Sequence, residues 1–268
     1  MTLRRVLGLV LLLLLVGLAA AQTGRGRRWA LYESEMQNPA DDPPDAWEKT
    51  EFAFARLRYR SDRDRRFFGR GSRWGIDANK SERQFIQGLR RLTRVHARSV
   101  EEIVDIDSDA LFDWPWLYAV GVGDWVLSDA QAARLRQYFD RGGFLVVDDF
   151  HNEREWASFM EGVAKIYPGR AFVELEDGDP IFHTVYDLDE RVQVPGLNVV
   201  PTPGYERGGV VPHWRGLMDD KGRVVIAAWF NMDLGDAWEW ADLPEYPEKY
   251  ASMAYRLGVN YVIYALTH

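Results

Sequence analysis

The apolar run Phe144–Val147 lies between a predicted helix end and a strongly polar segment. Arg141 falls in the last turn of that helix, and Gly142 and Gly143 end it, because glycine enters the left-handed backbone region at little cost. The run lacks the alternation of apolar and polar residues that a half-exposed strand shows. It therefore predicts a buried central strand of a mainly parallel sheet.

Similar patterns predict the other elements of one α/β domain. Further strands are expected over residues 51–59, 103–104, 116–122, 172–175 and 223–230. Helices are expected where apolar residues recur at helical spacing, over residues 85–92, 128–141, 155–166 and 248–266. Ser128 and Gln131 form a capping box at the start of the second helix. This capped helix and the strands on either side of it predict a βαβ unit with a right-handed crossover.

The first 21 residues have the order of a secretory signal, with Arg4 and Arg5, the apolar run Val6–Leu18 and small residues ending at Ala21. We expect cleavage near Ala21 and a periplasmic or secreted mature chain. The apolar run is shorter than the ~20 residues of a membrane-spanning helix, so no span is expected in the mature chain. An uncleaved anchor is the alternative.

The remaining chain divides into a leader and one domain. Residues 22–49 show no sustained period and predict an irregular leader, whereas residues 50–268 predict a single α/β domain. Within that domain, residues 176–215 contain many glycines and prolines and predict an irregular insertion. A long irregular segment in a compact domain is typical of a functional loop.

Charge and cysteine content exclude some functions. The chain has a net charge of −8 and no cysteine. Loss of Arg4 and Arg5 with the signal would lower the charge to −10. An acidic chain of this kind is not expected to bind nucleic acid. The chain has no disulfide framework and no cysteine to accept a lipid, so the core alone must stabilise the exported domain.

Polar residues follow two of the predicted buried strands. Asp148, Asp149 and His151 follow the strand at Phe144–Val147, and ligands bind outside the carboxyl ends of strands in open α/β sheets. These three are the candidate catalytic residues. Carboxylates at two strand ends suit a catalytic pair or a hard cation, which makes a divalent metal a candidate cofactor of unknown identity. The alternative is that these residues cap the helices that follow.

Other residues are candidates for ligand binding. Tryptophans beside carboxylates are typical of sugar-binding grooves, although they also fill cores. Histidines of the irregular region could face the same crevice, or could serve only as hydrogen-bonding residues of a loop. The arginine-rich segment 60–73 predicts either a solvated loop or a patch that holds an anion. Arg58 or Arg83 could relieve repulsion between gathered carboxylates. The candidate ligand-binding residues are Trp74, Asp77, Arg83, His183, Asn231, Asp233, Asp236, Trp238 and Glu239.

Five stretches between Phe52 and His268 carry a family resemblance. They are WGIDANKSERQFIQGLRRLT, GGFLVVDDFHNEREW, DPIFHTVYDLD, NMDLGDAWEWAD and YRLGVNYVIYALTH. These stretches resemble the bacterial family called domain of unknown function 4159, which itself is similar to class I glutamine amidotransferase-like folds. The resemblance implies a flavodoxin-like three-layer α/β sandwich and no established activity. Glutamine amidotransferases use a cysteine nucleophile, which this chain lacks.

Two functions of different classes remain. The first is an exported, non-catalytic module that binds a ligand or assembles with other envelope proteins. The second is a metal- or carboxylate-dependent hydrolase acting on cell-envelope glycans, in which the residues that follow the two strands converge on one cleft. The sequence leaves open whether the protein is an enzyme, and the partner could be an envelope protein, a small molecule or a glycan.

Overall fold

A computed structural model describes residues 42–61, 73–200 and 205–268 of the chain. Its centre is a seven-stranded, mostly parallel sheet with the order β3-β1-β4-β6-β9-β8-β7. The strands are β1 (Ala55–Arg58), β3 (Glu102–Asp105), β4 (Trp116–Val120), β6 (Phe144–Phe150), β7 (Val173–Glu174), β8 (His213–Met218) and β9 (Val224–Phe230). The first five strands of the order are mutually parallel. Strand β8 runs antiparallel to both of its neighbours, β9 and β7.

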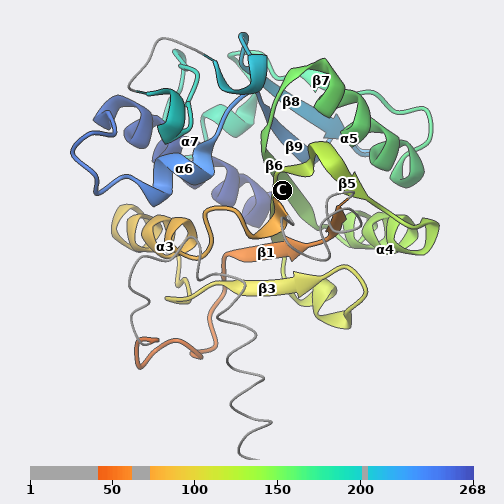
Figure 1. Ribbon diagram of the computed structural model, residues 1–268. Coiled ribbons are helices and arrows are strands. Elements are labelled where there is room, and N and C mark those ends of the chain that lie inside the picture. The colour runs from red at the N-terminus through yellow and green to blue at the C-terminus, as the bar shows by residue number, and fades with distance from the viewer. Residues whose placement is uncertain (1–41, 62–72, 201–204) are drawn as a thin grey trace, which may run out of the picture. The chain divides into compact units, whose positions relative to one another are not determined.

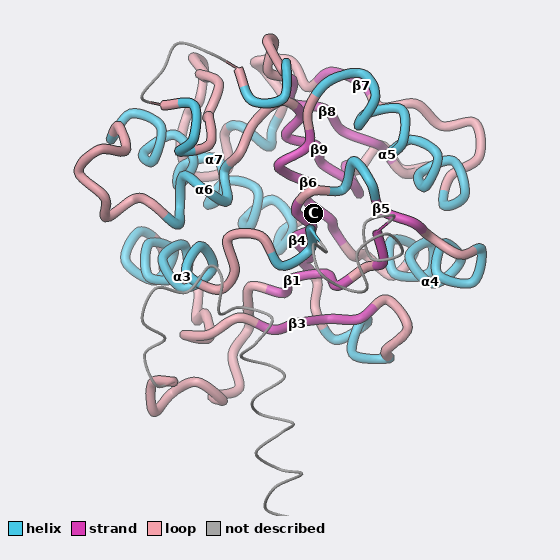
Figure 2. Tube along the Cα trace, viewed as in Figure 1, coloured by secondary structure: helices cyan, strands magenta, loops and turns pink. Residues whose placement is uncertain are grey.

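Helices cover both faces of this sheet, as the α/β prediction requires. They are α3 (Lys80–Leu92), α4 (Asp129–Asp140), α5 (Asn152–Ile166), α6 (Leu234–Glu239) and α7 (Glu248–Thr267). Helices α3, α6 and α7 pack together on one side, and α4 and α5 pack together on the other (Figure 1). Figure 2 shows the strands enclosed between these helices.

The predicted central strand is confirmed. Strand β6 lies between β4 and β9, and all seven of its residues are buried. Its apolar run is continuous because helices cover both faces, so neither set of alternate side chains meets water. The capping box at Ser128 and Gln131 is also present, and Gly142 follows α4 with a φ of 100°. These local signals place the strand and therefore the polar residues at its end.

The irregular insertion differs from its prediction at its carboxyl end. The predicted insertion runs to residue 215, but residues 213–215 begin β8, which pairs with β9 through a tight turn at residues 219–223. Burial alternates over His213–Gly216 and breaks at Leu217, so β8 lacks the sustained alternation that predicts a strand. The predicted strand at 172–175 is reduced to the two exposed residues of β7. A separate small sheet pairs β2 (Arg60–Ser61) with β5 (Trp125–Val126).

The predicted signal peptide and most of the predicted leader lie outside the described residues. Among the residues that are described, no helix is both long and apolar enough to cross a membrane.

Candidate functional site

Polar residues in the last part of β6 and directly after β9 meet at one edge of the sheet. The two strands are parallel neighbours, so their carboxyl ends point the same way. Asp148 Oδ2 accepts hydrogen bonds from the backbone N–H groups of Leu234 and Gly235, each at 2.9 Å. The carboxylate of Asp148 thus contacts the backbone at the start of α6, the helix that follows β9. The capping alternative holds for Asp148 in part, because it caps α6 and not α5, the helix that follows it in the chain.

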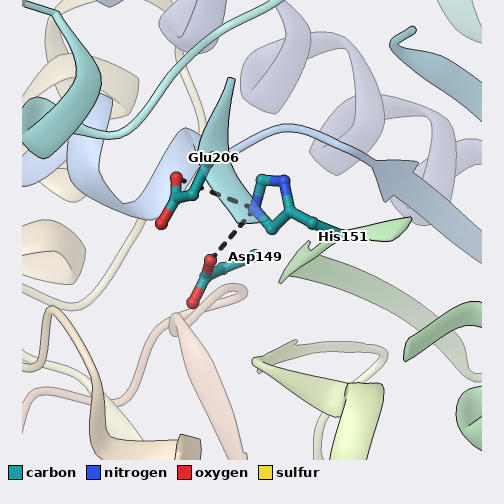
Figure 3. A group of neighbouring side chains, drawn as sticks. All are labelled: Asp149, His151 and Glu206. Atoms are coloured by element: carbon teal, nitrogen blue, oxygen red, sulfur yellow. Dashed lines mark hydrogen bonds and ion pairs between the residues drawn. The ribbon is translucent and has the colours of Figure 1, made fainter. Parts of the chain in front are cut away.

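One group of side chains surrounds the carboxylate of Asp149, and we call it the arginine cluster. Its members are Arg73, Asp149, His151, Glu155, Glu206 and Arg207. Arg207 Nη2 donates to Asp149 Oδ1 at 2.6 Å, and Arg73 Nη2 donates to Oδ2 at 3.2 Å. His151 Nε2 lies 3.3 Å from Asp149 Oδ1 and 3.7 Å from Glu206 Oε2 (Figure 3). Both oxygens of Asp149 are thus engaged by cationic groups.

The same two arginines also bind Glu155 of α5. Arg73 Nη1 and Arg207 Nε each lie 3.3 Å from Glu155 Oε1, while Oε2 accepts from the backbone N–H of His151 at 2.8 Å. Arg207 additionally pairs with Glu206 at 3.0 Å. Three carboxylates and two guanidinium groups therefore nearly balance inside a buried network.

The backbone at this edge is unusual. Asp149 has a φ of 49° and lies where the register between β6 and β9 shifts, as at a β-bulge. Asn231 and Asn152 also have positive φ, at 63° and 64°. Asn231 Oδ1 accepts from the backbone N–H of Asn152 at 2.9 Å, so this side chain ties the end of β9 to the start of α5. Non-glycine residues enter this region at a conformational cost, and such positions gather at functional sites.

A second group, the α6 cluster, lies around the start of helix α6. Its members are Asp77, Asp233, Asp236 and Glu239. Carboxylate oxygens of Asp77, Asp236 and Glu239 lie within 4.8 Å of one another. Asp233 is the N-cap of α6, and its Oδ1 accepts from the backbone N–H of Asp236 at 2.9 Å. Within the described ranges, Asp77, Asp233 and Asp236 form no ion pair.

Gly196 and Gly235 show how closely these carboxylates approach the backbone. A Cβ on Gly196 would lie 2.7 Å from Glu206 Oε2, 2.9 Å from Asp233 Oδ2 and 3.0 Å from Asp236 Oδ2. A Cβ on Gly235 would lie 2.4 Å from Asp77 Oδ2. The acids therefore converge from the irregular region, from α6 and from the turn before α3, and glycine leaves room for them.

Neighbouring aspartates at the end of β6 have pKa values that move in opposite directions. Burial alone would raise the pKa of Asp149, but the hydrogen bond with His151 and the charges of the two arginines hold that pKa below its ordinary range. Burial raises the pKa of Asp148 to about 7, although the hydrogen bond from Tyr118 acts in the other direction. One carboxylate is thus fixed in its charged form, and its neighbour binds a proton readily.

The acids of the α6 cluster also favour protons. Burial, followed by the charge of Asp236, raises the pKa of both Asp77 and Asp233 well above the ordinary value. Burial raises the pKa of Asp236 to about 6. The repulsion from the nearby acids outweighs the attraction of Arg56 for Asp77, so this cluster favours whatever neutralises it.

Several predicted site residues lie away from both clusters. Arg83 pairs with Glu101 and Asp42. His183 bonds to Asp187 at 2.9 Å and to the carbonyl of Asp177. The structure therefore does not bring Arg83 or His183 to either cluster. His213 contacts Glu174 and not the acids of the two clusters.

The predicted tryptophans are mainly core residues. Trp238 is fully buried, with its ring centroid 4.6 Å from that of Phe85. Trp74 is also buried, 5.7 Å from the guanidinium carbon of Arg58. Their surroundings favour the core-filling interpretation over a sugar-binding groove.

The prediction of which arginines relieve the carboxylates was wrong. Arg58 pairs with Asp105 on the neighbouring strand β3. The arginines at the site are Arg73, at the end of the arginine-rich segment, and Arg207, inside the irregular insertion. Sequence reasoning also missed Glu155 and Glu206. The arginine-rich segment was a usable signal for Arg73, whereas nothing in the sequence distinguishes Glu206 and Arg207 from other loop residues.

Comparison with known proteins gives the family and no function. No match was found among the curated proteins. A family model described as domain of unknown function (DUF4159) matches residues 53–266, which include every residue of both clusters. The chain therefore belongs to this family.

Proposed function

We propose that this chain is a non-catalytic ligand-binding module of the bacterial envelope, and that its ligand is a cation held by the α6 cluster. The observation that carries the proposal is the gathering of Asp77, Asp233 and Asp236 at a buried strand edge, without an ion pair among the described residues. Buried acids in contact destabilise each other unless a proton or cation relieves them. A bound cation would do so.

The state of the predicted catalytic residues supports binding over catalysis. Asp148, Asp149 and His151 are each no more than 2% exposed. A general acid or base must come within hydrogen-bond reach of a substrate atom. Asp149 is moreover engaged by two guanidinium groups, which lower its basicity and its nucleophilicity. A small ion needs far less access than a glycan.

A hydrolase acting on envelope glycans is the second candidate. It is favoured by the opposite pKa shifts of adjacent Asp148 and Asp149, since two carboxyl groups driven apart in pKa are suited to acid and base roles. Incubation with peptidoglycan fragments, followed by measurement of released reducing ends, tests this candidate. Turnover that Asp149→Asn abolishes, in a variant that stays folded, would replace the binding proposal.

We further propose that the fold is flavodoxin-like and similar to the class I glutamine amidotransferase-like folds. The five parallel strands, numbered in chain order, are arranged 2-1-3-4-5, which supports this assignment. An experimental structure with another strand order would overturn it. Because the chain has no cysteine, amidotransfer through a cysteine nucleophile is not part of the proposal.

Export is also proposed, because Arg4, Arg5, the apolar run and the small residues up to Ala21 have the order of a signal peptide. Protein recovered from the envelope fraction should begin near Gln22. Intact Met1 on that protein would contradict cleavage.

Thermal unfolding of chelator-treated protein with a panel of cations tests the binding proposal. The panel contains calcium, magnesium, manganese, zinc, sodium and spermidine. At least one should raise the Tm of the wild type, since a ligand that binds only the native state stabilises it. Asp236→Asn should reduce that rise. Asp109→Asn is the matched control, because the Asp109 side chain is 96% exposed and lies outside both clusters. If no cation raises the Tm, the proposal fails.

A further inference from the structure

We infer that the cation of the α6 cluster is a hard divalent metal ion, and that Asp77, Asp236 and Glu239 are its protein ligands. This inference rests on the proposed function, because it names the ligand class and the residues of that same site. The three carboxylates come from two elements and present oxygens within 4.8 Å of one another.

The local structure explains why these three side chains converge. Asp236 and Glu239 are three residues apart on α6, so they share one face of the helix. Asp77 lies in the turn that leads to α3, and its φ of 61° is a conformation that redirects the chain. Gly235 lets the Asp77 carboxylate approach, since a Cβ there would stand 2.4 Å from Oδ2.

A second observation points to a ligand. Asp77 is only 3% exposed, and its Oδ2 has no hydrogen-bond partner among the described residues. Buried polar atoms are nearly always bonded, because an unpaired one loses its hydration without compensation. Oδ2 is the Asp77 oxygen that lies against Gly235 of α6, and the Asp77 carboxylate has an oxygen within 4.8 Å of those of Asp236 and Glu239. A metal ion between the three carboxylates would satisfy it.

The donor set selects the class of metal. All three ligands are carboxylates, and hard cations such as Ca²⁺ and Mg²⁺ prefer oxygen ligands. Asp236 is partly exposed, so water can reach the ion and complete its coordination. A divalent charge also opposes the repulsion among these acids better than a monovalent one.

The other candidate group is less suited to a metal. Asp149, His151 and Glu206 also present ligand atoms within 4.8 Å of one another, and the imidazole would suit zinc. However, Arg207 Nη2 is 2.6 Å from Asp149 Oδ1, and Arg73 Nη2 is 3.2 Å from Oδ2. A metal there would have to displace a guanidinium group that already neutralises the carboxylate. Substitutions of the acids in the α6 cluster should therefore weaken metal binding, whereas substitutions in the arginine cluster should not.

Terbium luminescence and calorimetry test the inference on the full chain after treatment with chelator. Terbium is a substitute for calcium that prefers oxygen ligands, and its emission can be sensitised by Trp238 on α6 and by Trp240 at the C-cap of that helix. We expect sensitised emission that calcium or magnesium displaces, and a calorimetric binding isotherm for at least one of these two ions. Asp77→Asn, Asp236→Asn and Glu239→Gln should each raise the Kd at least tenfold, and Asp109→Asn should leave it unchanged.

The outcomes separate the inference from the proposed function. If spermidine or sodium stabilises the wild type but no divalent ion binds, cation binding stands and the metal inference fails. If zinc binds and His151→Gln abolishes its binding while Asp77→Asn does not, the metal lies in the arginine cluster and the inference fails. If no cation binds at all, both fail. Should Asp77→Asn not fold, the same comparison is made with Glu239→Gln, which keeps the side-chain volume.

Discussion

The arginine cluster and the α6 cluster contain the same kind of residue at the same edge of the sheet, and they differ in the cations that accompany them. In the arginine cluster, Arg73 and Arg207 hold Asp149 and Glu155 at distances between 2.6 and 3.3 Å. In the α6 cluster, Asp233 has no such partner among the described residues. Buried acids stabilise the fold where the chain neutralises them, and we propose that they form a binding site where it does not.

Adjacent residues illustrate the difference. Asp148 and Asp149 are both buried, yet the pKa of one is raised and that of the other is lowered. Burial acts on both in the same direction, so the cationic neighbours of Asp149 decide the outcome. Substitutions in the two clusters should therefore change stability with opposite signs.

Removal of an arginine should have the largest effect. Arg73→Met leaves Asp149 and Glu155 buried with one cation instead of two, and breaking a buried ion pair in this way typically costs about 3–5 kcal/mol of unfolding free energy. Urea unfolding followed by circular dichroism measures the loss. Arg170→Met is the control, because Arg170 pairs with Asp220, whose side chain is 77% exposed. A loss no larger than that of the control would show that the arginine cluster is not a stabilising network.

Paired aspartate substitutions should give the next largest effect and the clearest contrast. Asp149→Asn places an amide donor against the donors of Arg73 or Arg207 and should lower the unfolding free energy by about 1–3 kcal/mol. Asp236→Asn keeps an oxygen that can accept from Leu197 and removes a repulsive charge, so stability should stay unchanged or rise by up to about 1 kcal/mol. Both are measured in metal-free buffer. Equal losses in the two variants would erase the distinction between the clusters.

The sequence predicts the sheet edge well because its signals are local. A continuous apolar run specifies the buried strand β6, and a capping box starts the helix before it. Acidic residues in the last part of β6 and shortly after β9 had to meet once these strands became neighbours. Strand β8 was missed at its start because His213, Trp214 and Arg215 directly follow an irregular segment, and the alternation of burial that begins there breaks at Leu217.

The neutralising arginines were not predictable in the same way. Arg207 reaches Asp149 from a position 58 residues further along the chain, inside a region without periodic pattern. Arg58 and Arg83 lie close to family motifs, but proximity in sequence does not specify which acid a long side chain will bind. Arg58 instead pairs with Asp105 across the β1–β3 pair. Which distant loop residues pair depends on the tertiary fold. Whether a cluster of acids is neutralised by arginines therefore depends on the tertiary fold as well.

The pH dependence of the stability of the metal-free protein should reflect the raised pKa of Asp148. The pKa of Asp148 is about 7 in the folded chain and 3.8 when unperturbed, so the folded state holds a proton that the unfolded state releases between these values. Stability should therefore fall as pH rises from about 4 to about 7, by about 1.4 kcal/mol per pH unit for this group.

Asp148→Asn should reduce the slope of unfolding free energy with pH by the contribution of one titrating group. The amide oxygen still accepts hydrogen bonds from Leu234 and Gly235, but the amide does not titrate. The measurement is the unfolding free energy from urea titrations between pH 4 and 8, with chelator present. Asp109→Asn serves as the control for charge alone. An unchanged slope in Asp148→Asn would mean that Asp148 is ionised throughout this range.

The smallest expected effect comes from Gly235. Gly235→Ala adds a Cβ that would stand 2.4 Å from Asp77 Oδ2 and 2.8 Å from the Tyr118 hydroxyl, so the Asp77 carboxylate has to move away from its partners in the α6 cluster. Stability should fall by no more than about 1–2 kcal/mol, because the end of a side chain can shift and alanine favours the helix. The affinity for a divalent cation should fall severalfold, since the ligand oxygen is displaced.

Gly178→Ala is the matched control, because a Cβ at Gly178 meets nothing within 4 Å. Calorimetric titration with calcium or magnesium measures the affinity, and urea unfolding measures the stability, of both variants. A Gly235→Ala variant that loses affinity at nearly full stability places the ion beside Asp77. The reverse result, lower stability with unchanged affinity, would show that Asp77 packs against α6 without contacting the ion, and the neutralising ligand of the α6 cluster would then have to lie toward Asp233 and Gly196.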